Sequence, residues 1–146
     1  MSQETFVYVV YIASTPQKIW DALVRGELTR QYWGHENLSD WKRGSRWKHV
    51  TADAKRTVRI EGEVLEADPP RRLAMTWEDP EAGGKAKRTR VTMTLEPVKD
   101  MVRLTLRHDE LPPGSDMLRK ISEGWPRVLS SLKSFLETGR PLDTWA

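Results

Sequence analysis

The sequence contains no cysteine, which excludes disulfides, thiolate nucleophiles, iron–sulfur clusters and cysteine-ligated zinc sites. It also contains no run of about 20 uncharged apolar residues, the length that a transmembrane helix requires. The segment Met1–Glu4 lacks the basic and apolar regions of a signal peptide. We therefore expect a soluble, cytoplasmic protein with no membrane partner.

Neither sign of charge is in large excess. The 24 Lys and Arg residues and the 21 Asp and Glu residues give a formal net charge of +3 at pH 7. Basic residues concentrate in segment 41–60 and acidic residues in segment 61–82, so the fields of the two segments largely cancel. We expect no nucleic-acid partner, because such proteins present a broad basic surface. We expect instead that the two segments pair as neighbouring antiparallel strands across the solvent face.

Tryptophan, by contrast, is abundant. The chain has 146 residues, of which 38% are hydrophobic and 31% charged, and this composition predicts one globular domain over residues 1–146. Seven Trp residues outnumber the three Tyr and two Phe residues together. Such rings fill cores, but they also line apolar binding pockets. Composition alone leaves both uses open.

The N-terminal third predicts one strand and two short helices. Residues 5–12 form a continuous apolar run, which is typical of a strand buried on both faces. A hydroxyl N-cap at Ser14 or Thr15, followed by Pro16, predicts a first helix that ends near residue 26. A second helix is expected from Leu28 to a C-terminal glycine at position 34. Residues 34–44 are expected to be irregular or to form a short strand.

From Ser45 to Asp109 the hydrophobic period changes to two. This alternation predicts an antiparallel sheet with one covered face and one wet face. Gly62 is expected to mark a bulge or a tightly curved position, and residues 81–87 to form an exposed hairpin loop. The predicted strands of this part are 45–51, 57–67, 72–78, 88–96 and 102–108.

The covering element is a long C-terminal helix. Ser115 or Asp116 can cap a helix over residues 116–138 that ends at Gly139, and its length of about 34 Å suffices to cross the sheet. The apolar stripe of this helix consists of Leu118, Ile121, Trp125, Val128, Leu129, Leu132, Phe135 and Leu136. The predicted fold class is therefore α+β, with a curved antiparallel sheet of about six or seven strands, two short helices and a long C-terminal helix.

This order of elements is that of the helix-grip fold, and particular motifs sharpen the match. The chain resembles the START-like (SRPBCC) superfamily, and within it the family related to the C-terminal domain of the activator of the 90-kDa heat-shock protein ATPase. The segments that carry the resemblance are Ile12–Leu23, Leu28–Trp33, Gly62–Trp77 and Gly124–Glu137.

The resemblance implies a cavity between the sheet and the long helix that accepts a small hydrophobic molecule. It implies no particular activity, because folds of this kind carry many functions. The eukaryotic activators have an additional N-terminal domain that takes part in chaperone binding. Since this sequence has no room for such a domain, we expect no appreciable acceleration of the chaperone's ATPase.

The candidate cavity residues are the aromatic, methionine and histidine side chains on the inward faces of the predicted elements, with leucines beside them. Rings and flexible Met side chains suit an adaptable apolar site, and an inward histidine can orient a ligand or hold a core hydrogen bond. The three His residues have no short ligand spacing, so we expect no metal and no cofactor. The candidates are Trp33, Trp47, His49, Met75, Trp77, Met93, Leu106, His108, Trp125, Leu129 and Leu132.

Three functions remain open on the sequence alone. The leading hypothesis is a non-enzymatic domain that binds a small hydrophobic or aromatic molecule. The second is a protein-interaction module of the stress response, related to the chaperone ATPase activators and bound to a protein partner. The third is an enzyme of the cyclase or hydratase type, in which a cavity histidine moves a proton.

Overall fold

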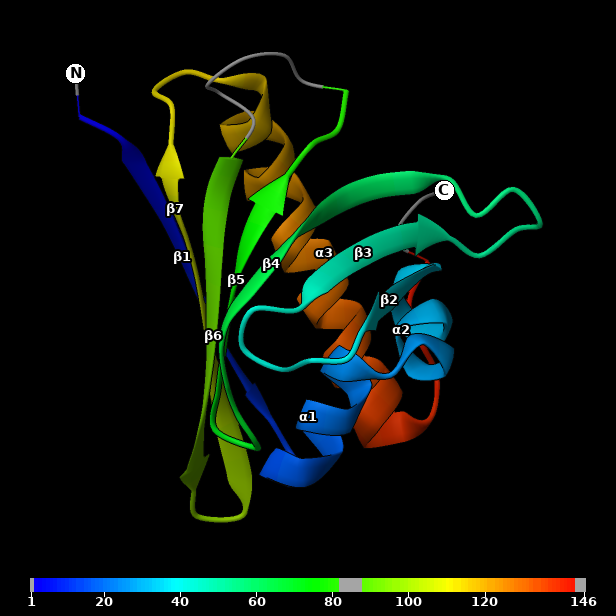
Figure 1. The fold of residues 1–146 in the computed structure, drawn as a ribbon. Helices are drawn as coiled ribbons and strands as arrows, with labels where there is room; N and C mark the ends of the chain where they lie inside the picture. Colours follow the sequence, from blue (N-terminus) through cyan, green and yellow to red (C-terminus); the bar gives the residue numbers. More distant parts are fainter. Residues whose placement is uncertain (1, 82–87, 144–146) are drawn as a thin grey trace.

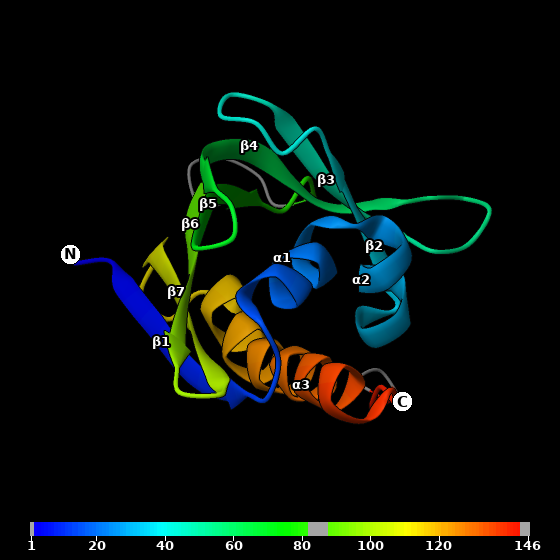
Figure 2. The ribbon, with the colours of Figure 1, turned by 90° about the horizontal axis from the view of Figure 1, so that it is seen from below.

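One antiparallel sheet of seven strands curves around three helices in the computed structural model, which describes residues 2–81 and 88–143 (Figures 1 and 2). Most of the predicted loop at 81–87 lies outside the described residues. The strands follow the order β1-β7-β6-β5-β4-β3-β2, which confirms the α+β helix-grip prediction. The elements are β1 (Glu4–Ile12), α1 (Pro16–Val24), α2 (Gly26–Trp33), β2 (His35–Ser39), β3 (Arg46–Thr51), β4 (Val58–Asp68), β5 (Arg72–Glu78), β6 (Arg88–Val98), β7 (Met101–Leu111) and α3 (Asp116–Thr138).

The helix ends agree with the capping signals in the sequence. The Thr15 side chain accepts a hydrogen bond from the Lys18 N–H at the start of α1, and Ser115 caps α3 in the same way. Gly34 and Gly139 end α2 and α3 with φ of 84° and 81°, a left-handed conformation that glycine adopts without strain.

The segment after α2, which the sequence left open, forms the edge strand β2. Thr29 on α2 holds it in place, because its hydroxyl accepts the Asn37 N–H at 3.0 Å and donates to the Gly26 carbonyl at 3.1 Å. On its other side β2 pairs with β3. The contact with α2 is a tertiary one, which hydrophobic periodicity does not report.

Strand β1 was predicted to be buried on both faces, and this prediction was wrong. β1 lies at the edge of the sheet, where Val7, Val9 and Tyr11 on its outer face are 52%, 46% and 42% exposed. A continuous apolar run predicts a strand, but the number of layers that cover the strand is set by its place in the sheet.

The C-terminal end of the β1 edge is covered by two charged side chains of α3. Lys133 Nζ donates to the Tyr11 carbonyl at 2.6 Å, and Glu137 accepts the Ala13 N–H at 2.7 Å. The two side chains are also paired with each other at 2.7 Å. The hydrogen bond from Ala13, together with Lys133, holds the pKa of Glu137 below its usual value. Backbone groups that an edge strand leaves open are thus satisfied by side chains.

The opposite charges of neighbouring segments lie in register, as the sequence predicted. On β3 and β4, Arg46 is opposite Glu63 and Lys48 is opposite Glu61. Attraction across the strands supports this register on the solvent face.

At Gly62 the main-chain pairing between β4 and β5 is interrupted. Between the registered pairs Glu61–Glu78 and Val64–Met75, side chains replace main-chain partners. Trp47 Nε1 donates to the Thr76 carbonyl at 2.8 Å, and the Glu63 N–H donates to the Thr76 hydroxyl at 2.8 Å. A Cβ at Gly62 would lie 2.7 Å from Trp47 Nε1 and closer still to the Thr76 carbonyl oxygen. The Trp47 side chain passes position 62 of β4 to reach Thr76 on β5, and only glycine at this position leaves room for it.

Helix α3 lies along the concave side of the sheet (Figure 2). Its buried apolar residues pack in one core with inward residues of the strands, among them Val91, Leu104 and Val102. The buried apolar residues of α3 are Ile121, Trp125, Val128, Leu129 and Leu132. No helix in the described part of the chain is both long enough and apolar enough to cross a membrane. A cytoplasmic location stays a prediction.

We expect Gly62→Ala and Gly124→Ala to change stability in opposite directions. At Gly62 the added methyl group forces Trp47 and Thr76 apart, so the free energy of unfolding should fall by about 3 kcal/mol. At Gly124, inside α3, a Cβ meets no heavy atom within 4 Å, and the better helix propensity of Ala should raise it by about 1 kcal/mol. Urea denaturation measures both; equal effects of the two variants would contradict the role assigned to Gly62.

Candidate ligand-binding cavity

Trp77 on β5 lies at the centre of a cluster of aromatic rings on the concave side of the sheet. Its ring centroid is 5.0 Å from that of Trp125 on α3 and 5.3 Å from that of Trp47 on β3. It also stacks on Trp33 of α2 at 6.2 Å. All four side chains are buried. The cluster therefore joins four elements that are far apart in the sequence.

His108 on β7 belongs to a chain of hydrogen bonds that ends at the same cluster. Trp125 Nε1 donates to His108 Nδ1 at 3.1 Å. Because an indole N–H can only donate, Nδ1 accepts and the proton of the neutral ring is on Nε2. Nε2 lies 2.7 Å from the Thr89 hydroxyl oxygen, and this hydroxyl donates to the Trp77 carbonyl at 2.7 Å. The chain links α3, β7, β6 and β5.

Both ring nitrogens of His108 are thus occupied by the protein itself. Burial lowers the pKa of His108 to about 4, although Asp109 nearby partly opposes this shift. The ring is therefore neutral near pH 7, as its bond from Trp125 requires. His108 is inward-facing, as predicted, and acts as a hydrogen-bonded core residue.

His49 on β3 is placed differently. It is 5% exposed, and its Nδ1 lies 2.6 Å from Asn37 Oδ1, directly across from it on β2. Since the amide oxygen only accepts, Nδ1 carries the proton and donates it to Asn37. Burial, and then the nearby charges of His35 and Arg59, lower the pKa of His49 to about 3. His49 is therefore neutral, and its Nε2 is an acceptor.

A cavity of about 740 Å³ opens beside His49 and Trp77. It lies between strands β2 to β5 and the N-terminal half of α3, with Trp33 of α2 in its wall. Rings and aliphatic side chains form the inner wall, and charged side chains surround the mouth. The apolar and histidine side chains of the wall are Trp33, His35, His49, Val58, Ile60, Trp77, Met117, Ile121, Trp125 and Val128.

Four of the candidate residues from the sequence line this cavity: Trp33, His49, Trp77 and Trp125. The other candidates are buried in the core around it and do not form its wall. They are Trp47, Met75, Met93, Leu106, His108, Leu129 and Leu132. All eleven candidates are buried, and only tertiary packing separates the two groups.

Several wall residues were not among the candidates. Val58 and Ile60 follow the period-two pattern of β4, and Ile121 and Val128 belong to the predicted stripe of α3, so the sequence did contain a signal for them. His35 had no such signal, since it lies on β2, the strand that periodicity left open. Its ring centroid is 4.8 Å from that of His49.

The charges at the mouth are mixed and almost all exposed. Three cations face four carboxylates, so the mouth has no strong preference for one sign. No group of three His, Cys, Asp or Glu side chains that could hold a metal ion occurs among residues 2–81 and 88–143. The charged residues are Arg59, Lys120, Arg127, Asp79, Glu81, Asp116 and Glu123.

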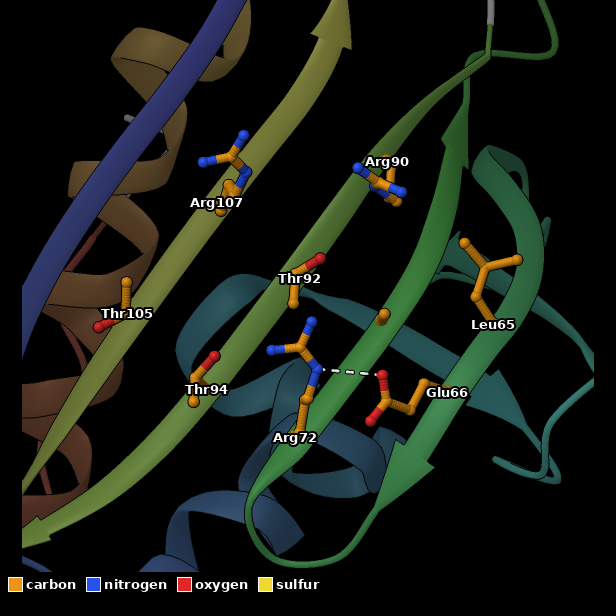
Figure 3. A pocket seen from close by; sticks show the side chains of 9 residues that line it. Leu65, Glu66, Arg72, Arg90, Thr92, Thr94, Thr105 and Arg107 are labelled. Carbon is orange, nitrogen blue, oxygen red and sulfur yellow. Dashed lines mark hydrogen bonds and ion pairs between the residues drawn. The ribbon is translucent and has the colours of Figure 1, made fainter.

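A second, smaller hollow of about 350 Å³ lies on the outer face of the sheet (Figure 3). Each of its three arginines is already paired with a carboxylate. Arg72 Nε lies 3.0 Å from Glu66, while Arg90 and Arg107 converge on Asp109 at 2.7 Å and 3.3 Å. The bonds from Arg90 and Arg107 lower the pKa of Asp109. We interpret this hollow as an ion-paired solvent face.

The sheet, the gripped helix and the cavity between them define a helix-grip domain of the START-like (SRPBCC) superfamily. Within this class the chain belongs to the family described as activator of Hsp90 ATPase homolog 1-like protein, whose model matches residues 13–137. The family resemblance that the sequence motifs indicated is therefore confirmed.

Solved structures share the fold. The Aha1 dimer from Colwellia psychrerythraea has a TM-score of 0.77 and 20% identity, with 93% of this chain and 98% of that chain covered. Protein MLL2253 from Mesorhizobium loti has a TM-score of 0.77 and 25% identity, over 92% and 97%. PFC0360w, an HSP90 activator from Plasmodium falciparum, has a TM-score of 0.75 and 19% identity, over 90% and 95%. No curated protein shows a significant sequence match.

We expect His108→Gln to reduce the dependence of stability on pH. His108 has a pKa of about 4 in the folded protein and about 6.5 in the unfolded chain, so only the unfolded chain takes up its proton between these values. The contribution of this pKa difference to the free energy of unfolding is complete above pH 6.5. It is lost as the pH falls toward 4, by at most about 1.4 kcal/mol per pH unit. Gln keeps a donor and an acceptor but does not titrate.

Urea denaturation at several pH values from 7 to 5 measures the effect. The slope of the free energy of unfolding against pH should be smaller for the variant by the equivalent of up to one bound proton, whatever its absolute stability. His49 continues to titrate in both proteins. Parallel slopes would show that His108 is not held neutral by the bond from Trp125.

Proposed function

We propose that the protein binds a small, mostly apolar or aromatic molecule in the cavity between its sheet and α3, without transforming it. The observation that carries this proposal is a cavity of about 740 Å³ lined by Trp33, Trp77 and Trp125. Small-molecule sites typically enclose about 300 to 1,000 Å³ and have mainly apolar and aromatic walls with few polar groups.

Gly124 supports the proposal from the side of the helix. It lines the cavity between the wall residues Lys120, Ile121 and Val128, which precede and follow it by about one helical turn. A Cβ at this position would enter open space. A side chain is thus absent at the point where α3 faces the cavity, and the space is kept open at a cost in helix propensity.

The state of the histidines favours binding over catalysis. A general base works best with a pKa near the working pH. The pKa of His49 is lowered to about 3, so its imidazole is a weak base near pH 7. His108 has no nitrogen available, because Trp125 and Thr89 occupy both. The arrangement fits an orienting role better than the proton transfer of a cyclase or hydratase.

Filling the cavity from Gly124 tests the proposal. We expect 2-naphthol to quench the tryptophan fluorescence of the wild-type protein saturably and to raise its melting temperature through binding linkage. In Gly124→Phe the ring occupies the space, so the affinity should fall at least about tenfold while the protein stays folded. Gly124→Ala is the matched control and should bind nearly as the wild type does. Equal binding by both variants would place the probe outside the cavity.

A second candidate is a role at a chaperone, which the family description and the likeness to an HSP90 activator from Plasmodium falciparum favour. Such a role would use the surface, so it should survive Gly124→Phe. The test adds the wild type and this variant in stoichiometric amounts to the ATPase assay of the 90-kDa chaperone. A several-fold acceleration by both proteins at moderate salt would support this role over ligand binding.

A further inference from the structure

His49 lines the cavity and has one ring nitrogen that its bond to Asn37 leaves open. Its Nδ1 is occupied by Asn37 at 2.6 Å, and no hydrogen bond within residues 2–81 and 88–143 uses its Nε2. The proton on Nδ1 leaves a lone pair on Nε2, so this atom can accept but not donate. The cross-strand position opposite Asn37 fixes the ring in this state.

An acceptor without a partner is costly in such surroundings. His49 is 5% exposed and lines the cavity, so water in the cavity is the partner open to Nε2. A ligand that displaced this water without replacing its hydrogen bond would leave Nε2 unpaired and would bind about tenfold more weakly or worse. A ligand that donates a hydrogen bond avoids this cost.

The rings around His49 restrict the shape of the donor. The centroid of Trp33 lies 4.5 Å from that of His49, and Trp77 lies 6.2 Å away. His35 is packed at 4.8 Å on the adjacent strand. Aromatic faces at these distances suit a flat ring system, which keeps offset or edge contacts with several of them at once.

The charges exclude an ionic group at this depth. The inner wall around His49 consists of rings and aliphatic side chains, whereas Arg59, Lys120 and Glu123 are exposed at the mouth. An anion placed beside His49 would lose most of its hydration and would gain only the exposed, solvent-screened charge of Arg59, and a cation would be repelled by the same charge.

We infer that the cavity selects an uncharged, planar molecule that donates a hydrogen bond from a hydroxyl or a ring N–H group to Nε2 of His49. This inference rests on the proposed binding function and adds the class of ligand. His49 is then the specificity-determining residue of the cavity, and Asn37 is the positioning residue that holds its proton on Nδ1.

Two probes of nearly equal shape test the inference in the wild-type protein. 2-Naphthol carries a hydroxyl donor, and 2-methoxynaphthalene has the same rings without a donor. We expect 2-naphthol to bind about tenfold more tightly in calorimetric or fluorescence titration, the effect of one hydrogen bond to a buried acceptor. Nitrogen NMR should show Nε2 of His49 unprotonated, with a resonance that shifts on addition of 2-naphthol much more than on addition of 2-methoxynaphthalene.

His49→Phe keeps a ring at this position but removes the acceptor. In this variant the affinity for 2-naphthol should fall to that for 2-methoxynaphthalene, whose own affinity should change by no more than about twofold. His108→Gln is the control, because His108 does not line the cavity, and it should keep the preference for 2-naphthol. If His49→Phe does not fold, the comparison of the two probes in the wild-type protein still tests whether the cavity prefers a hydrogen-bond donor.

The outcomes separate this inference from the proposed function. If both probes bind the wild type with equal affinity and are blocked by Gly124→Phe, the cavity binds small molecules but the inferred selectivity is wrong. Tighter binding of 2-methoxynaphthalene, or a protonated Nε2, overturns the inference as well. If neither probe binds, the proposed function fails together with it.

Discussion

The structure depends on a close approach at Gly62, where the pairing of β4 with β5 is interrupted and a side chain would collide with Trp47 and Thr76. Strands β3 and β4 curve away from β5 toward α2, so that one sheet surrounds the helices on its concave side (Figures 1 and 2). At the interruption, the Trp47 N–H and the Thr76 hydroxyl satisfy the backbone groups that are left without ladder partners. An interruption with unsatisfied buried groups would be unstable.

The curvature of β3 and β4 also accounts for the cavity. The middle of α3 is tied to the sheet through Trp125 and His108, and beyond this point Leu129 and Leu132 pack closely against it. Toward its N-terminus the helix instead faces strands that have swung outward, and Gly124 places no side chain in the gap. The same sheet therefore packs closely against one end of α3 and forms the wall of a cavity at the other end.

Much of this arrangement was available from the sequence. The 3.6-residue and two-residue periods located α3 and the strands of the sheet, and the Pro16 and Gly34 signals bounded the short helices. Gly62 was recognised as a special position because glycine in a strand indicates a bulge or a close approach. The double burial of β1 was predicted wrongly, because an apolar run does not show whether its strand is central or at an edge. Strand β2 was missed as a definite element, since its contacts with α2 are tertiary.

The sequence by itself determined the fold class and most of the side chains that face inward, because local periodicity records which face of each element is covered. Only the tertiary structure decided which of these side chains form a wall and which form a core, since that depends on the distance between α3 and the sheet at each level. The same holds for the two inward histidines. His108 lies opposite Trp125 and Thr89, which use both its nitrogens, whereas His49 lies opposite Asn37, which uses only one. No spacing along the chain encodes these partners, because they come from elements that meet only when the sheet closes around the helix.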